Sequence, residues 1–326
     1  MCVTNLWKRS AAADGLALDA SAHYEVIPMK TVLLTAALAA LAITAQAAPK
    51  SKAAPQISPA AVAKAAVPPK PVAPTAADWR TPDPNDVLVI DTNKGRILVE
   101  MIPEAAPKTV AQVRALAHES FYDGHKFFRV IENFMDQTGD PLNNGTGGST
   151  KPNIPAEFLF RRGADTGFVL AADQTVSEVG FLKSLPVQSQ SMMLATMTRD
   201  QKVSAWGLFC PGVAGMARGG DPDSANSQFF LMRGPYPSLE RQYTAWGRVL
   251  SGVEAVRAVK VGEPPAEPQD YIEHVRLLAD MPEKDRLKVR VIDPKGAWFK
   301  AEIARLRTLR GTDFSVCDIE IPVGVK

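Results

Sequence analysis

Residues 121–141 read FYDGHKFFRVIENFMDQTGDP, a stretch that places one arginine among large apolar side chains. Arg129 follows two phenylalanines and precedes a Val-Ile pair, and Gln137 comes eight residues later. A guanidinium is always charged and carries five donors in a planar fork, so its place among aromatics needs a reason. Either its aliphatic stem packs on the surface while its head meets a carboxylate, or it serves a site.

Runs with β character recur around this stretch. Val87–Thr92 (VLVIDT) and Arg96–Met101 (RILVEM) are separated by Asn-Lys-Gly, a hairpin signal because Gly readily takes a positive φ. Later strand-like segments cover residues 126–131, 227–232, 243–250 and 273–281, and helical spacing covers 109–117 and 253–259. Many short strands with two short helices favour a closed or sandwiched all-β domain over βαβ units.

Three blocks, in order and with matching spacing, resemble the cyclophilin family of peptidyl-prolyl cis-trans isomerases, in a bacterial exported form. They are YDGHKFFRVIENFMDQTGDP with the GTGG after it, GMARGGDPDSANSQFFLM, and YTAWGRVLSGVEAV. The resemblance covers residues 87–281 apart from one long insertion. It implies a mainly β fold, an eight-stranded antiparallel closed barrel capped by two helices, with an active groove on its outer face.

The resemblance implies that Arg129 is the catalytic residue and that Gln137 orients it. Rotation about an X–Pro bond is opposed by a resonance barrier of roughly 18–20 kcal/mol, and the imide nitrogen regains a lone pair when the bond is twisted. A donor aimed at that lone pair stabilises the twisted state and not the planar ground states. This chemistry needs no cofactor, and 4 histidines and 3 cysteines without clustering argue against a metal site.

The resemblance also implies a substrate site. It consists of an apolar slot for the proline ring and an adjoining strip for the residues that precede proline. The predicted substrate-binding residues are Phe134, Met135, Ala217, Ala225, Asn226, Gln228, Phe230, Leu239 and Tyr243. The apolar members could equally be ordinary core. Several positions depart from the family pattern. Phe128 and Tyr243 each replace a common histidine, and Ser238 stands where many relatives have a tryptophan. Thr138 replaces a common glycine, which would strain the backbone if a positive φ is required there.

The N-terminal part is typical of an exported chain. Residues 29–47 (MKTVLLTAALAALAITAQA) have the lysine, the apolar run and the small-x-small ending of a Sec-type signal peptide, with a buried helix as the alternative. Either residues 1–28 are an unstructured leader, or the start at residue 1 is mis-assigned and Met29 is the true start. Residues 48–84, rich in Ala and Pro, are expected to form an extended linker. We therefore expect a periplasmic or secreted protein with no stable membrane anchor after cleavage.

Two segments lie outside the family pattern. The insertion at 149–209 contains two apolar stretches and is predicted to form a small ordered subdomain, either a lid or partner surface or a structural addition. After an isomerase domain at 85–281, residues 282–326 are predicted as a β-α-β extension: a strand at 288–293, a helix from Ala297 to a stop at Gly311, and a strand at 313–323.

Cys210 and Cys317 remain as a pair if the chain starts at Met29. In an exported protein they can form a disulfide that joins the C-terminal extension to the barrel, or they can stay as two buried thiols.

The charge balance and the motifs define the expected partners. With 37 Lys and Arg against 35 Asp and Glu, the formal charge of +2 gives no support for a nucleic-acid partner. We expect a monomeric isomerase that acts on proline-containing polypeptides. The alternatives are a catalytically weak proline-peptide binding module and a chaperone.

Overall fold

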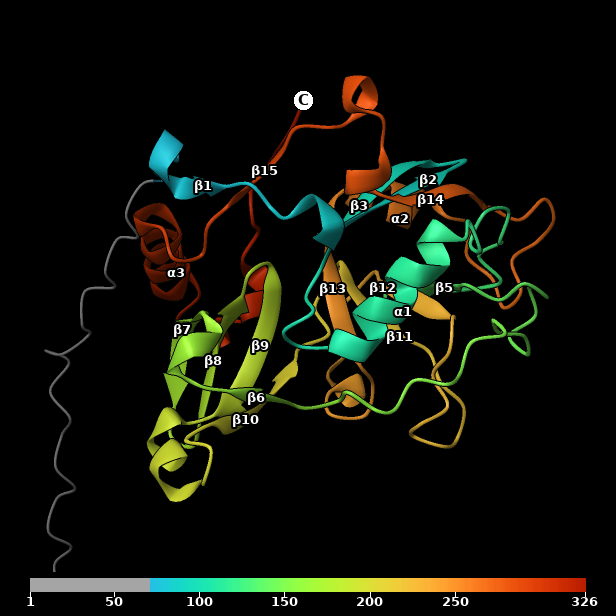
Figure 1. Cartoon of the computed structure of the whole chain (residues 1–326). Helices are drawn as coiled ribbons and strands as arrows, with labels where there is room; N and C mark the ends of the chain where they lie inside the picture. Colours follow the sequence, from blue (N-terminus) through green and yellow to red (C-terminus); the bar gives the residue numbers. More distant parts are fainter. Residues whose placement is uncertain (1–70) are drawn as a thin grey trace, which may run out of the picture. The chain divides into compact units, whose positions relative to one another are not determined.

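The computed structural model describes residues 71–326, so the predicted leader, signal peptide and most of the linker lie outside the described residues. The described part has three antiparallel sheets and three α-helices (Figure 1). The strands are β1 (Trp79–Arg80), β2 (Val87–Thr92), β3 (Gly95–Met101), β4 (Arg129–Ile131), β5 (Met135–Thr138), β6 (Phe160–Arg162), β7 (Phe168–Gln174), β8 (Ser177–Leu182), β9 (Leu185–Gln190), β10 (Val203–Gly207), β11 (Val213–Met216), β12 (Phe229–Met232), β13 (Ala245–Ser251), β14 (Ile272–Leu277), β15 (Val289–Ile292) and β16 (Val323–Val325). The helices are α1 (Pro107–His118), α2 (Val253–Ala258) and α3 (Ala297–Arg310). Within residues 71–326, no helix combines the length and the apolar character that crossing a membrane requires.

The largest sheet has eight antiparallel strands in the order β14-β2-β3-β13-β11-β12-β5-β4, which confirms the predicted architecture. The predicted hairpin is its β2–β3 pair. The closed barrel, however, is an overstatement, because no ladder joins β4 to β14. Val130 of β4 instead exchanges two backbone hydrogen bonds of 2.8 Å with Gly262, so a loop occupies the free edge of β4 and the sheet forms a curled half-barrel.

Side-chain alternation gives this sheet two buried faces. In β12, Phe229 and Leu231 point into the core inside the half-barrel, where Phe229 meets Trp246 edge-on, with ring centroids 5.8 Å apart. Phe230 and Met232 point to the outer face and belong to a second hydrophobic cluster. The outer face therefore needs its own cover.

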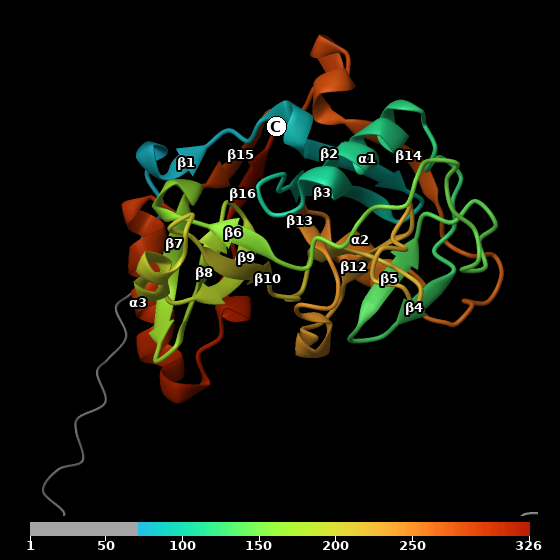
Figure 2. The same ribbon diagram turned by 60° about the horizontal axis from the view of Figure 1, so that its bottom comes forward.

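The insertion and the C-terminal extension provide that cover together. The insertion folds as a five-stranded antiparallel sheet in the order β6-β10-β9-β8-β7. Figures 1 and 2 both show α3 beside β7 and β8, where Phe299 packs edge-on against Phe181 at 5.1 Å. These side chains share one cluster with Phe230 and Met232 of the barrel, so barrel, insertion and extension have a common core.

Two predicted boundaries are wrong. The linker was expected to reach residue 84, but β1 already pairs with β15, and Arg80 forms two hydrogen bonds with Glu100, which is 1 % exposed. The strand expected at 313–323 is instead irregular, and strand β16 begins only at Val323. Ser315 Oγ accepts from the backbone N–H of Cys317 and Asp318 accepts from that of Ser315, and such local bonds favour a turn over a strand.

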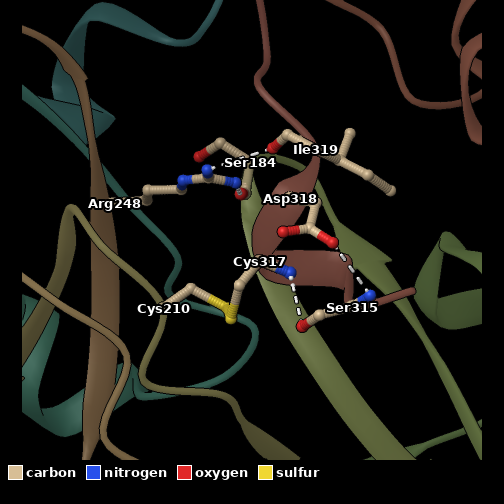
Figure 3. Close-up of a disulfide and its surroundings, with 7 residues drawn as sticks. All are labelled: Ser184, Cys210, Arg248, Ser315, Cys317, Asp318 and Ile319. Carbon is tan, nitrogen blue, oxygen red and sulfur yellow. Dashed lines mark hydrogen bonds between the residues drawn. A yellow bond between two sulfur atoms is a disulfide. The ribbon is translucent and has the colours of Figure 1, made fainter. Parts of the chain in front are cut away.

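A disulfide joins Cys210 to Cys317, with Cα atoms 5.1 Å apart (Figure 3). Beside it, Arg248 of β13 donates to the carbonyls of Ser184 in the insertion and Ile319 in the extension, at 3.2 and 3.3 Å. Burial lowers the pKa of Arg248 to about 10, so it stays protonated at neutral pH. The disulfide and the charge-assisted hydrogen bond from Arg248 therefore help to connect the extension to the rest of the fold.

We predict that the Cys210→Ala/Cys317→Ala variant loses about 2–5 kcal/mol of unfolding free energy, because the bridge closes a loop with a sequence separation of 107. Thermal unfolding with and without a reducing agent measures the effect. The wild type should melt at a lower temperature when it is reduced, whereas the variant should not respond. A wild-type midpoint that is indifferent to reduction would contradict the prediction.

Candidate active site

One row of cross-strand neighbours crosses the outer face of the half-barrel. Arg129 in β4 opposes Gln137 in β5, Gln137 opposes Phe230 in β12, and Phe230 opposes Gly215 in β11. Directly opposed side chains lie about 4.5–5.5 Å apart at Cβ, and Figure 2 shows β4, β5 and β12 side by side. The sheet register thus brings together residues that are distant in the sequence.

Gly215 leaves the space that the ring of Phe230 occupies. A Cβ at Gly215 would overlap both that ring and the ring of Phe209. The two rings stack, with centroids 5.8 Å apart and planes inclined by 30°. Phe230 is therefore fixed on the sheet by its neighbours.

Arg129 lies at the edge of this surface with its guanidinium partly in solvent. Its side chain is 40 % exposed, and its Nε donates to Glu263 Oε2 at 2.7 Å. The guanidinium carbon lies 5.9 Å from the centroid of the Phe134 ring. Among residues 71–326, neither terminal amino group of Arg129 has a hydrogen-bond partner, so both are available to a ligand.

Gln137 contacts a different partner from the expected one. The predicted orienting hydrogen bond to Arg129 is absent from the described residues, since Gln137 Nε2 donates to Gln228 Oε1 at 2.9 Å. Gln228 Nε2 in turn donates to the carbonyls of Gly145 and Gly147, at 3.1 and 2.7 Å. Glu263, which the sequence did not single out, is the residue that holds Arg129.

The predicted apolar residues lie in one cluster but differ in depth. Met135, Phe230 and Leu239 are 1 %, 4 % and 8 % exposed, so they form the floor. Phe134 and Tyr243 are only partly buried and pack against that floor. Phe134 lies 4.3 Å from Tyr236 between ring centroids, and Tyr243 meets Phe230 edge-on at 6.2 Å.

The remaining predicted residues, with the exception of Ala225, line a small cavity next to this surface. Its volume is about 170 Å³, and Gln137, Ala217, Asn226 and Gln228 are among its lining residues. Ala225 is buried, and its carbonyl accepts from the backbone N–H of Ile154 at 2.7 Å. The carbonyl of Asn226 also has a protein partner, the side chain of Gln112 at 2.9 Å.

Asp140 organises the loop that supports Gln228. Although burial opposes ionisation, backbone N–H bonds from Leu142, Asn144 and Gly145 hold the pKa of Asp140 below its ordinary value. A Cβ at Gly147 would overlap the Asp140 carboxylate, which explains that glycine. An aspartate followed by Asn and Gly residues is a turn signal that could have identified this loop.

Thr138 causes none of the expected strain. It lies within β5, and its hydroxyl donates to the carbonyl of Lys126 at 2.9 Å. The positive φ falls on the next residue, Gly139, at 85°.

The chain is similar to known proteins over its eight-stranded sheet. Residues 87–277 match the family described as "Cyclophilin type peptidyl-prolyl cis-trans isomerase/CLD". The chain is 34% identical over 191 residues to the "Probable peptidyl-prolyl cis-trans isomerase" of Brucella suis biovar 1 (strain 1330), which covers 55% of this chain and 74% of that protein. The protein of the same description from Brucella abortus (strain 2308) has the same identity and coverage.

A solved structure of a cyclophilin is also similar to this chain. The crystal structure of cyclophilin AquaCyp293 from Hirschia baltica is 34% identical, has a TM-score of 0.71, and covers 78% of this chain and 98% of that chain. The matched family segment begins at the first residue of β2 and ends at the last residue of β14, so it spans the whole eight-stranded sheet. The chain therefore belongs to the family of cyclophilin-type peptidyl-prolyl cis-trans isomerases.

Proposed function

We propose that the protein is a monomeric, exported isomerase that accelerates rotation about X–Pro bonds in exported polypeptides, with Arg129 stabilising the twisted imide. The observation that carries this proposal is the position of Arg129. Its two terminal amino groups have no partner among the described residues, and they lie beside an apolar surface to which Phe134 contributes.

In the proposed mechanism a proline ring lies against Phe134, Phe230 and Tyr243. This contact excludes water from one side of the prolyl bond, and hydrogen bonds become stronger in a medium of lower dielectric constant. The terminal amino groups of Arg129 then donate to the nitrogen lone pair that appears as the bond twists. No proton is transferred, and no covalent bond forms or breaks.

Glu263 has a positioning role in this mechanism. By accepting from Nε at 2.7 Å, it fixes one edge of the guanidinium and leaves the opposite edge for substrate. The side chains of Arg129 and Glu263 are 40 % and 51 % exposed, so solvent screens the ion pair and its strength is modest.

Export is supported by two features. Residues 29–47 have the pattern of a signal peptide, and disulfides such as Cys210–Cys317 persist mainly in oxidising compartments.

We predict that Arg129→Ala lowers kcat/KM for a short proline peptide by about 10²–10³-fold, the usual cost of removing one donor to a transition state. A peptide isomerisation assay measures it. Arg96→Ala is the matched control, because Arg96 is 43 % exposed and pairs with Asp91 on β2, which does not neighbour β4, β5 or β12 in the sheet. Equal rates for wild type and Arg129→Ala would favour the proline-peptide binding module.

We predict that Glu263→Gln lowers kcat/KM by about 1.4–5-fold, because an exposed ion pair contributes about 0.2–1 kcal/mol. The same assay at low ionic strength measures the change. An increase in rate would show instead that Glu263 competes with the substrate for Arg129.

We predict that the mature protein begins at Ala48 and is found in the periplasm or the medium. N-terminal sequencing after cell fractionation tests this. A mature protein that starts within residues 1–28 would contradict the signal-peptide assignment.

A further inference from the structure

Arg218 is a second arginine next to the apolar cluster of the candidate site, and its guanidinium has more partners than that of Arg129. Its Nε donates to the carbonyl of Gln242 and its Nη1 to that of Gly219, both at 2.9 Å. Two aromatic rings flank its guanidinium carbon, Tyr243 at 4.6 Å and Phe158 at 5.4 Å from the ring centroids. Two carbonyls and two rings therefore fix the position of this cation.

One of the two rings comes from the insertion. Phe158 precedes β6, and three sets of contacts fix the chain just before it, one between backbones and two that involve a carboxylate. Ile154 bridges to Ala225, the N–H of Ala156 donates to the Asp223 carboxylate at 2.8 Å, and Glu157 accepts from the first N–H groups of α1 at 2.9 and 2.8 Å. The insertion thus supplies one wall of the Arg218 site.

The charge of Arg218 is not neutralised within the described part of the chain. No carboxylate lies within ion-pair distance of it among residues 71–326. The nearest acidic residues in sequence, Asp221 and Asp223, accept from the backbone N–H groups of Asp223 and Ala156. The partners of Arg218 are neutral carbonyls and ring faces, so a full negative charge would be an additional favourable partner.

Arg218 also lines the small cavity of about 170 Å³ that contains Gln137. Gln137 directly opposes Arg129 across β4 and β5. A polypeptide whose prolyl bond lies at Arg129 can therefore place a neighbouring side chain in this cavity. A volume of this size is suited to one side chain rather than to a separate ligand, since ligand pockets are typically about 300–1,000 Å³.

We propose that Arg218, clamped by Phe158 and Tyr243, is a specificity-determining residue that selects polypeptides with an Asp or Glu side chain shortly before the proline. This inference rests on the proposed isomerase function and adds a substrate preference to it. It also gives the insertion a role in recognition.

The test compares matched peptides with Glu, Gln or Lys at the second and the third residue before proline. For wild type, we expect kcat/KM for the Glu peptide to exceed that for the Gln peptide by about two- to five-fold at one of these positions, as for a partly exposed ion pair. The ratio should fall towards one as salt is added. In Arg218→Gln the Glu/Gln ratio should be about one at low salt, and in Phe158→Ala it should be reduced.

Charge reversal and a matched control keep the test decisive. Arg218→Glu should prefer the Lys peptide over the Gln peptide. Arg241→Gln should keep the wild-type ratio, because Arg241 stacks on Trp206 at 5.1 Å and does not line the cavity. A wild-type ratio of one, or a ratio that Arg218→Gln leaves unchanged, would overturn the inference. A different result would contradict the proposed function: the Arg129→Ala variant would isomerise all the peptides at the wild-type rate.

Discussion

The site depends on the alternation of side chains along β12 and its neighbours. Because Phe229 and Leu231 fill the inside of the half-barrel, Phe230 and Met232 must point outward. A row of large apolar side chains on the outer face is either covered by another segment of the same chain or left as a surface that can bind a ligand. In this protein the insertion and α3 cover part of the outer face, and the side chains of Arg129 and Gln137 stay partly exposed beside it.

The proposed mechanism depends on what surrounds Arg129. A guanidinium fully enclosed by carboxylates would have no donors left for a substrate, and one in open water would gain little from a hydrogen bond. Arg129 lies between these limits, with one edge held by Glu263 and a phenyl ring nearby. Preorganisation of this kind suits a reaction whose only requirement is a donor at a nitrogen that changes geometry.

Local sequence signals were sufficient to predict the strands and helices of the scaffold. They were insufficient to predict which side chains meet at the candidate site. The β2–β3 hairpin and α3 were predictable, because a turn glycine and a helix stop lie next to clear periodic patterns. The stretch around Cys317 was not, since alternating apolar residues suggested a strand while Ser315 and Asp318 form local turns. Glu263 and Arg218 could not have been assigned either. Glu263 is separated from Arg129 by 134 residues, and the ring beside Arg218 comes from an insertion without a family pattern.

The insertion and the extension are connected to the site through a short path. Phe209, the last residue of the insertion, stacks on Phe230, and the next residue is Cys210, which is bonded to Cys317 in the extension. Phe230 is in turn the register partner of Gln137. Because close-packed interiors transmit strain, the C-terminal extension and the ring of Phe230 are physically linked. The additions to the isomerase sheet are therefore part of the structure that positions its site, and not separate appendages.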